Sequence, residues 1–160
     1  MPPFSPDSID IKILNELQEN SKLTNVELAT RINLTPSPCL ARVRALEQAG
    51  MISRYVTLLD PTKLGLGLSV FIQVGMERQA ERDLRAFQTA ITDYEEVMEC
   101  YLMTGDFDYL IRVVVADMPA LQRFIVDKLT RISGVSNIKS SFALEQVKYK
   151  TALPLRFPSR

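Results

Sequence analysis

The chain of 160 residues has no histidine and only two cysteines, Cys39 and Cys100. Without histidine, Ser-His-Asp and Cys-His nucleophile chemistry and every metal site with an imidazole ligand are excluded. The cysteines form no C-x-x-C motif. A disulfide between them is conceivable, but the pattern favours two buried small hydrophobic side chains in a reducing compartment. Acid–base catalysis would have to use carboxylates, lysine or tyrosine, so we expect no enzyme, no catalytic residue, no metal and no cofactor.

An excess of charge of one sign is also missing, because nineteen Lys and Arg balance nineteen Asp and Glu. Overall basicity therefore does not indicate a nucleic-acid partner. No apolar run approaches the roughly 18 residues that a membrane-spanning helix needs. The first residues also lack the basic region and apolar stretch of a secretory signal. We expect a cytoplasmic protein without membrane contact, with one domain or two small ones.

The first sixty residues begin with the signals of two short helices. Asp7 or Ser8 can cap a first helix, which Asn20 ends. Thr24 and Glu27 match a capping box, in which each side chain satisfies a free backbone N–H group, and they open a second helix. The apolar side chains at helical spacing, expected to point inward, are Ile9, Ile13, Leu14, Leu17, Leu28, Ala29 and Ile32.

A third helix is predicted from Thr35-Pro36, an N-cap followed by proline, to Gln48-Ala49. Gly50 is placed to end it in a left-handed C-cap. The tight connection over residues 33–35 gives the second and third helices the spacing of a helix-turn-helix. The expected inward stripe of the third helix is Cys39, Leu40, Val43 and Leu46.

The segment 51–59 is rich in β-forming residues and is interpreted as a strand, either a wing or a linking strand. Gly65 and Gly67 then mark a boundary; they precede a strand instead of following one, so they are no dinucleotide-binding fingerprint. We therefore divide the chain into residues 1–62, a helix-turn-helix domain with its linking strand, and residues 63–160.

Strands and helices alternate in the second part of the chain. The strands are expected at 68–76, 97–104, 109–116 and about 135–148, and the helices at 81–93 and from Asp117 to Gly134. The order βαββαβ is that of a ferredoxin-like α+β domain, with both helices on one face of an antiparallel sheet. The last strand alternates through Ile138, Ser140, Phe142 and Leu144. An uncovered apolar face on so small a sheet favours a homodimer.

The third helix is the candidate for a DNA-recognition helix. Its outward face combines Arg44 with small residues, which allow close approach to a surface, and arginine can bond phosphate or guanine bidentately. A solvated face is the alternative interpretation. The candidate DNA contacts are Arg31, Ser37, Pro38, Ala41, Arg42, Arg44, Gln48 and Arg54, with Ala45 also facing outward.

Residues 1–62 carry six basic and seven acidic side chains, but from Arg31 to Arg54 four arginines face only Glu47. The positive charge is therefore local, and we expect weak non-specific affinity for each module. Useful binding of double-stranded DNA would require several modules acting together.

The turn 104–109, Thr-Gly-Asp-Phe-Asp-Tyr, is the other concentration of polar groups. It is either a tight hairpin with solvated carboxylates or a small-ligand site. In the second case, exposed backbone N–H groups would hold a ligand carboxylate and an aspartate would hold an ammonium group.

Several motifs together resemble one family. They are Ile11-x-Ile13-Leu14-x-x-Leu17-Gln18, Asn25-Val26-Glu27-Leu28-Ala29, Leu34-x-Pro36-x-Pro38-Cys39-Leu40-x-Arg42-Val43, Leu46-Glu47-x-x-Gly50 and Gly105-Asp106-Phe107-Asp108-Tyr109-Leu110. In this order, from about Ser8 to Leu155, the chain resembles the leucine-responsive, Lrp/AsnC or feast/famine transcription regulators of bacteria and archaea. The proline-rich and Gly-Asp segments look nearest to the leucine-responsive branch.

The resemblance implies a winged helix-turn-helix and an amino-acid-sensing domain, in a cytoplasmic, nucleoid-associated regulator. It also implies homodimers that pair through their sheets and assemble to tetramers or octamers, with the effector between dimers near the 105–109 turn. Its implied effector contacts are Tyr101, Met103, Thr104, Gly105, Asp106, Phe107, Asp108 and Thr130. An apolar wall of Met103, Phe107 and Leu110 favours leucine or methionine.

Two other classes of protein are alternatives. An enzyme with a regulatory amino-acid domain is disfavoured, because no catalytic domain fits in the remaining sixty residues. The alternative that stays open is an architectural DNA-binding protein without a small-molecule effector, which would compact DNA through oligomer geometry alone.

Overall fold

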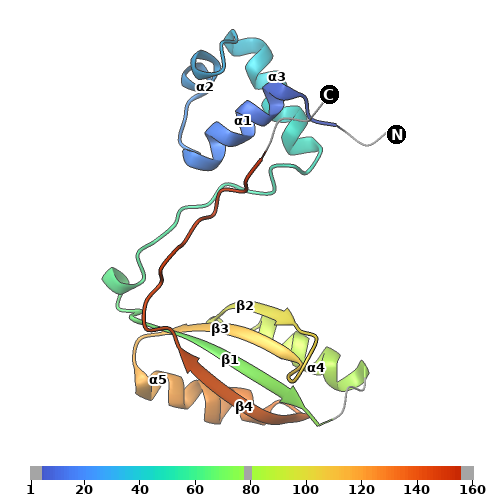
Figure 1. The fold of residues 1–160 in the computed structure, drawn as a ribbon, viewed down its shortest axis with the longest axis vertical. Coiled ribbons are helices and arrows are strands. Elements are labelled where there is room, and N and C mark those ends of the chain that lie inside the picture. The colour runs from blue at the N-terminus through green and yellow to red at the C-terminus, as the bar shows by residue number, and fades with distance from the viewer. Residues whose placement is uncertain (1–4, 78–80, 156–160) are drawn as a thin grey trace. The chain divides into compact units, whose positions relative to one another are not determined.

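The computed structural model describes residues 5–77 and 81–155, which form two compact units (Figure 1). The first unit comprises residues 5–58 with residues 148–155, and the second comprises residues 59–147. The C-terminal residues 148–155, expected in the second domain, thus lie with the first unit. They are held there by Gln18, whose Nε2 donates to the Leu153 carbonyl (3.3 Å) and whose Oε1 accepts from the Leu153 N–H (2.6 Å).

The three predicted helices of the first unit are α1 (Ser8–Glu19), α2 (Asn25–Arg31) and α3 (Pro36–Gln48). Asp7 caps α1 by accepting from the backbone N–H groups of Ile9 (2.8 Å) and Asp10 (2.9 Å). The predicted capping box of Thr24 and Glu27 is present in full. Because each start is fixed by groups within three residues, these local signals were sufficient to predict it.

The end of α3 is also as predicted. Gly50 has a φ of +72°, its N–H donates to the Glu47 carbonyl (3.0 Å), and the next N–H, of Met51, donates to the Leu46 carbonyl (3.0 Å). This is the Schellman arrangement, for which glycine is favoured because it has no Cβ. At the other end, the Thr35 side chain makes no capping hydrogen bond, although Pro36 begins the helix as expected.

The core of the first unit consists of buried apolar side chains from all three helices: Ile13, Leu28, Ala29, Ile32, Cys39 and Leu46. Cys39 is completely buried, as predicted, but Cys100 in the second unit is exposed and both are free thiols. The prediction of a second buried cysteine was wrong because Cys100 lies on β2 (Val97–Leu102), the strand at one edge of the sheet.

The predicted strand at 51–59 is not formed: the described backbone there belongs to no strand. Nor does the last strand reach residue 148, because it ends at Phe142. β-Branched and aromatic residues favour an extended backbone, but a strand also needs a neighbouring strand to complete its hydrogen bonds. Among the described residues, neither segment has such a neighbour.

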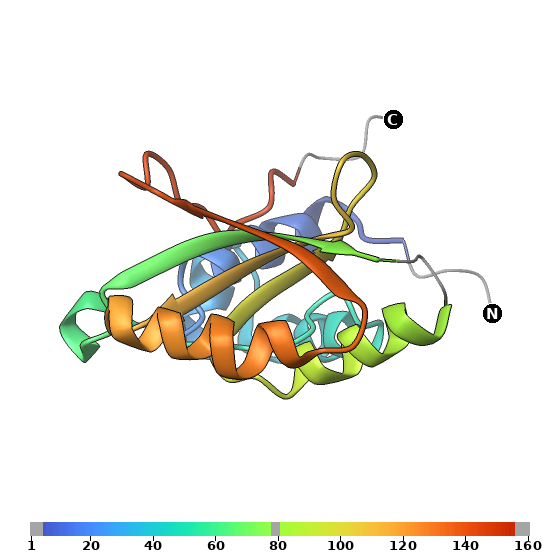
Figure 2. The same ribbon diagram turned by 90° about the horizontal axis from the view of Figure 1, so that it is seen from below.

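The second unit is a four-stranded antiparallel sheet in the order β2-β3-β1-β4. Its elements are η1 (Thr62–Leu64), β1 (Leu68–Met76), α4 (Glu81–Thr92), β2, β3 (Tyr109–Val115), α5 (Met118–Arg123) with its continuations η2 (Phe124–Lys128) and η3 (Leu129–Arg131), and β4 (Val135–Phe142). Figure 2 shows α4 and α5 on the same face of the sheet. This is the predicted α+β, ferredoxin-like arrangement. Among the described residues, no helix combines the length and apolar character needed to cross a membrane.

The core of the second unit lies between the sheet and its two helices. Alternate residues of β1 and β3, such as Val70, Ile72 and Ile111, are fully buried beneath α4 and α5. Phe87 of α4 stacks on Tyr109 of β3, with ring centroids 4.3 Å apart. Phe87 on α4 and Phe124, which is 1% exposed, thus anchor the two helices on the sheet.

The uncovered face of the sheet is not the apolar face that was expected. Ile138, Ser140 and Phe142 pair with Val74, Ile72 and Val70, so they face the helices; Leu144 lies beyond the strand. The opposite face combines apolar side chains with polar and charged ones, and Glu99 Oε1 and Arg112 Nη2 form an ion pair across it (2.6 Å). A second copy packed on this face would have to accommodate these charges.

Candidate functional site

In the first unit, α2 and α3 are locked together as a helix-turn-helix. The Leu34 N–H donates to the Ala29 carbonyl across the turn (2.9 Å). Asn25 Nδ2, at the start of α2, donates to the Pro36 carbonyl at the start of α3 (2.8 Å). These bonds fix the angle at which α3 leaves the turn, and an exposed α3 face at a fixed angle is what a major-groove helix requires.

The exposed side chains of α3 match the predicted outward face at Ser37, Ala41, Arg44 and Gln48, and Pro38, expected on its flank, is exposed as well. Two positions differ. Leu40, expected in the inward stripe, is 38% exposed, and Ala45, expected outside, is half-buried. Pro38, Ala41 and Ala45 line a hollow of about 390 Å³ that is bordered by Asp10 and Arg42, so the small residues do leave room for close approach.

Arg42 is directed toward α1. Its Nη1 donates to Asp7 Oδ2 and to Asp10 Oδ1, each at 2.8 Å. Asp10 is the buried charged residue of the described chain, at 5% exposure. Hydrogen bonds from the Asp10 backbone and from the guanidinium hold the pKa of Asp7 below its ordinary value, and the two carboxylates raise the pKa of Arg42. Arg42 therefore joins the first turn of α1 to the middle of α3.

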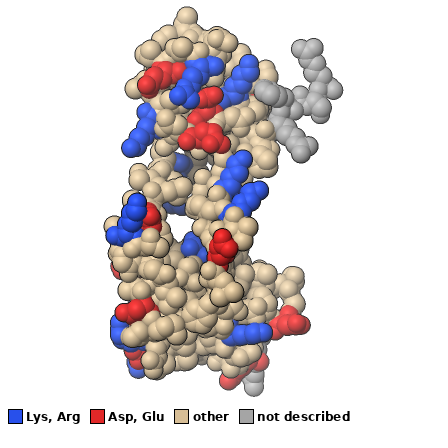
Figure 3. Space-filling model, turned by 60° about the vertical axis from the view of Figure 1, so that its left-hand side comes forward, with Lys and Arg blue, Asp and Glu red and all other residues tan. Residues whose placement is uncertain are grey.

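The other predicted arginines differ in their partners. Arg31 Nη1 pairs with Glu16 Oε2 at 2.9 Å, whereas Arg44 and Arg54 are exposed and form no ion pair among the described residues. Tyr55 donates to Glu47 (2.9 Å), and its burial together with that carboxylate raises its pKa to about 12. On the face drawn in Figure 3, basic and acidic side chains are intermixed. Of the four arginines from Arg31 to Arg54, only Arg44 and Arg54 thus remain without an ion pair among the described residues, fewer than the sequence suggested.

In the second unit, the loop 103–108 between β2 and β3 is anchored by Asp108. The Asp108 N–H donates to the Val74 carbonyl (3.0 Å), its carbonyl accepts from Met103 (2.8 Å), and its Oδ2 accepts from the Met76 N–H (2.7 Å). Gly105 turns the loop with a φ of +123°. Asp108 therefore has a structural role, because it holds the loop on β1. Asp106 is exposed.

Beside this loop lies a cavity of about 370 Å³ on the uncovered face of the sheet. It is lined by Gln73, Gly75, Asp106, Phe107, Asn137 and Lys139. The register explains this set, because Gln73 pairs with Lys139 and Gly75 with Asn137 on the adjacent strands β1 and β4. An acid, a base, two amides and an aromatic ring therefore surround one small space, a set suited to a small ligand with both charges.

Four of these residues were missed by sequence reasoning: Gln73, Gly75, Asn137 and Lys139. Their alternation with the buried residues of their strands can be recognised in the sequence. The pairing of β1 with β4, which brings them together, cannot. Most predicted effector contacts lie elsewhere. Tyr101 is 52% exposed and donates to Glu99 (3.1 Å), while Thr130 donates to the Val126 carbonyl within the α5 extension (2.8 Å). Met103, Thr104 and Gly105 belong to the same loop but do not line the cavity.

A metal centre finds no support in the part of the chain that the structure describes, where no group of three or more His, Cys, Asp or Glu side chains is placed to hold an ion. The two sites offer hydrogen bonds, charge and apolar contact on α3 and around the loop 103–108.

Comparisons with known proteins match both units. Residues 6–53 match the family model for winged helix-turn-helix DNA-binding domains, and residues 69–153 match that for Lrp/AsnC ligand-binding domains. The chain is 41% identical over 150 residues to the leucine-responsive regulatory protein of Escherichia coli K12, covering 94% of this chain and 92% of that protein.

Solved structures agree along nearly the whole chain. A transcriptional regulator of Neisseria meningitidis, solved as a complex with L-methionine, superposes with a TM-score of 0.90 at 43% identity, covering 94% of this chain and 97% of that one. An AsnC family regulator of Agrobacterium tumefaciens gives 0.88 at 39% identity, covering 93% and 97%. With a DNA-binding helix-turn-helix in one unit and an amino-acid-binding domain in the other, the chain belongs to the Lrp/AsnC family of transcriptional regulators.

Proposed function

We propose that the protein regulates transcription in response to a free amino acid bound in the cavity beside the loop 103–108. The observation that carries this proposal is the placement of Asp106 and Lys139 on the same cavity with Phe107. A free amino acid has one ammonium group, one carboxylate and a side chain, and this cavity offers one partner for each.

The roles in the cavity follow from charge. Asp106 accepts hydrogen bonds from the ammonium group, and Lys139 pairs with the carboxylate. Phe107 contacts an apolar side chain. The similar Neisseria meningitidis regulator was solved with L-methionine, which supports an aliphatic or sulfur-containing effector such as methionine or leucine.

On the DNA side, Arg44 is the candidate for base contact, with Ser37, Pro38, Ala41 and Gln48 at the groove surface. Arg54 serves phosphate contact. Arg31 and Arg42 are already paired with carboxylates of α1, so Arg42 orients α3 and Arg31 reaches phosphate only by giving up Glu16. The similar proteins of Neisseria meningitidis and Agrobacterium tumefaciens are transcriptional regulators. The same role for this chain involves no catalytic activity and places it at the bacterial nucleoid in the cytoplasm.

The ligand acts through assembly. Recognition helix and cavity lie in different units, so an amino acid can alter DNA binding only by its different affinity for different states of the protein. A homodimer that associates to tetramers or octamers supplies such states. Four predicted effector contacts do not line the cavity within one chain: Tyr101, Met103, Thr104 and Thr130. In an assembly they can complete the site, either by a movement of the loop or from a neighbouring copy of the chain.

Calorimetric titration of the full chain with each of the twenty amino acids tests the effector. We expect one or a few apolar amino acids to bind, and Asp106→Asn or Lys139→Gln to weaken binding at least about tenfold, the effect of losing a charged hydrogen bond. Lys148→Gln, a change at an exposed lysine of the first unit, is the control and should bind as the unmodified protein does. Failure of all twenty to bind would favour the architectural DNA-binding protein.

A further inference from the structure

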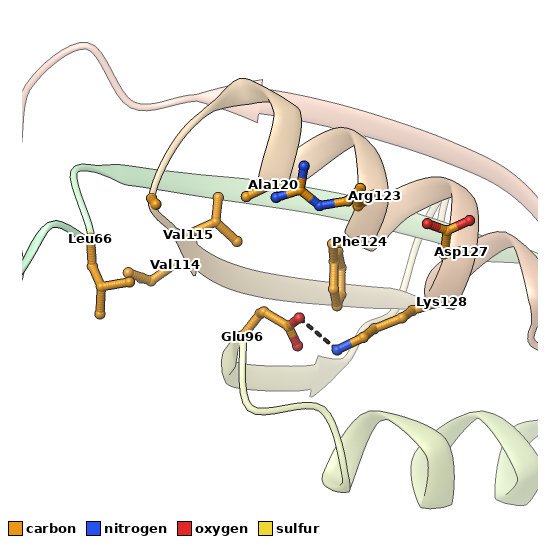
Figure 4. A pocket seen from close by; sticks show the side chains of 10 residues that line it. Leu66, Glu96, Val114, Val115, Ala120, Arg123, Phe124, Asp127 and Lys128 are labelled. Atoms are coloured by element: carbon orange, nitrogen blue, oxygen red, sulfur yellow. Dashed lines mark hydrogen bonds and ion pairs between the residues drawn. The ribbon is translucent and has the colours of Figure 1, made fainter.

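A second hollow, of about 410 Å³, lies in the second unit between α5 and the end of β3. It is at the opposite end of β3 from the loop 103–108, and on the helix side of the sheet. Figure 4 shows Glu96 and Lys128 on one side of it and Arg123 on the other, with Val115 and Phe124 between them. The hollow is therefore separate from the proposed effector site beside the loop 103–108.

One atom of this hollow lacks a partner. Glu96 Oε1 accepts from Lys128 Nζ at 2.6 Å, but Glu96 Oε2 is buried and has no hydrogen-bond partner among the described residues. Burial raises the pKa of Glu96, yet the hydrogen bond from Lys128, a hydrogen bond from the Glu96 backbone N–H and the charge of Lys128 together outweigh it and hold the pKa below its ordinary value. An ionised oxygen that is buried without a donor is costly, and such groups in proteins call for a partner.

The charges around the hollow restrict the chemistry of that partner. Glu96 and Asp127 balance Arg123 and Lys128. A simple cation at Glu96 Oε2 is repelled by the two basic residues, and a simple anion at Arg123 is repelled by the two acids. A molecule with both charges can place its cation beside Glu96 and its anion beside Arg123, and it leaves the net charge of the hollow unchanged. The apolar floor, formed by Val115, Ala120 and Phe124, suits a hydrocarbon group.

We propose that this hollow is a second small-ligand site, which takes a zwitterionic α-amino acid with an apolar side chain. The ammonium group donates to Glu96 Oε2, the carboxylate pairs with Arg123, and the side chain lies on Ala120 and Phe124. The site is independent of the cavity beside the loop 103–108, so either site can exist without the other.

Two-dimensional ¹⁵N–¹H NMR of the full chain, titrated with L-methionine, tests the proposal in an Asp106→Ala background that weakens the loop site. We expect the amides of residues 96, 120 and 128 to shift and saturate. Glu96→Gln should weaken this binding at least about tenfold, and Ala120→Leu, which fills the hollow, should abolish it. Glu95→Gln, a change of the exposed neighbouring carboxylate, should leave it unchanged.

Two fragments of the ligand separate its charges. 3-Methylbutylamine and 4-methylpentanoate should each bind at least about tenfold more weakly than leucine, because each lacks one ionic partner. If the amides of residues 96, 120 and 128 do not shift at high concentrations of L-methionine, in both the Asp106→Ala and the unmodified chain, the proposal is overturned and the hollow is left to water. Equal binding by Glu96→Gln and Glu95→Gln would also overturn it. Absence of shifts at residues 105–107 in the unmodified chain, with shifts at residues 96, 120 and 128 retained, would instead refute the effector site.

Discussion

Replacing Arg42 by alanine should destabilise the first unit, because it leaves the buried carboxylate of Asp10 without its cation. Removing one partner of a fully buried ion pair costs about 3–5 kcal/mol. Here the Arg42 side chain is 33% exposed and that of Asp7 is 50% exposed, although that of Asp10 is only 6% exposed. Water can therefore replace part of the lost interaction, and we expect a loss of about 2 kcal/mol in the free energy of unfolding.

The measurement is urea unfolding of the full chain, followed through NMR signals of amides in α1, α2 and α3. With a urea slope of about 1–3 kcal/mol per molar, the midpoint for these signals should fall by about 1 M. Arg44→Ala is the matched control, since it removes an exposed arginine from the same helix and should change stability by no more than about 0.5 kcal/mol.

A double-mutant cycle refines the test. Asp10→Asn removes the buried charge, so Arg42→Ala should cost much less in that background than alone. Equal midpoints for Arg42→Ala and Arg44→Ala would refute the reasoning and return Arg42 to the list of DNA contacts.

Three further predictions concern the two sites and the helix cap. Arg44→Ala should cost about 1–3 kcal/mol of specific DNA binding, whereas Arg54→Ala should weaken binding to all sequences and flatten its salt dependence; gel shifts on specific and random duplexes at several salt concentrations distinguish these. The pKa of folded Asp7 lies below its ordinary value of 3.8, so its contribution to stability is present above that value and is lost as the pH falls through the lower, folded value. Urea midpoints of the first unit should decline in that acid range, and less so with Asp7→Asn. Gly105→Ala should strain the loop at its φ of +123° and weaken amino-acid binding in calorimetry; unchanged binding would mean that the loop does not shape the cavity.

Sequence alone was sufficient where structure is set by neighbours in the chain. Asp7, Thr24 and Gly50 fix helix ends through groups no more than five residues away, and each prediction was confirmed. Asp117 likewise caps α5 by accepting from the Ala120 N–H (2.8 Å). The order of strands and helices gave the ferredoxin-like arrangement for the same reason, since each element carries its own periodicity.

Sequence was insufficient where a partner lies far along the chain. Arg42 was read from helix periodicity alone, which does not show that Asp7 and Asp10 lie beside it. Lys139 joins Asp106 only through the register of β4 on β1. The segment 51–59 was predicted as a strand from its composition. Composition can favour an extended backbone, but it does not show whether a second strand lies alongside to pair with it. The alternation of apolar residues along β4 was predicted correctly. However, those residues face the helices and not the uncovered face of the sheet.

The central claim is that an amino acid bound at Asp106 controls how the protein binds DNA. Its most direct test is fluorescence anisotropy of duplex DNA from upstream of the protein's own coding region, titrated with the full chain with and without L-methionine or L-leucine. We predict that the amino acid changes the apparent affinity or the cooperativity about fivefold or more in the unmodified chain, and that Asp106→Ala binds DNA normally but does not respond. A full response by Asp106→Ala would contradict the account.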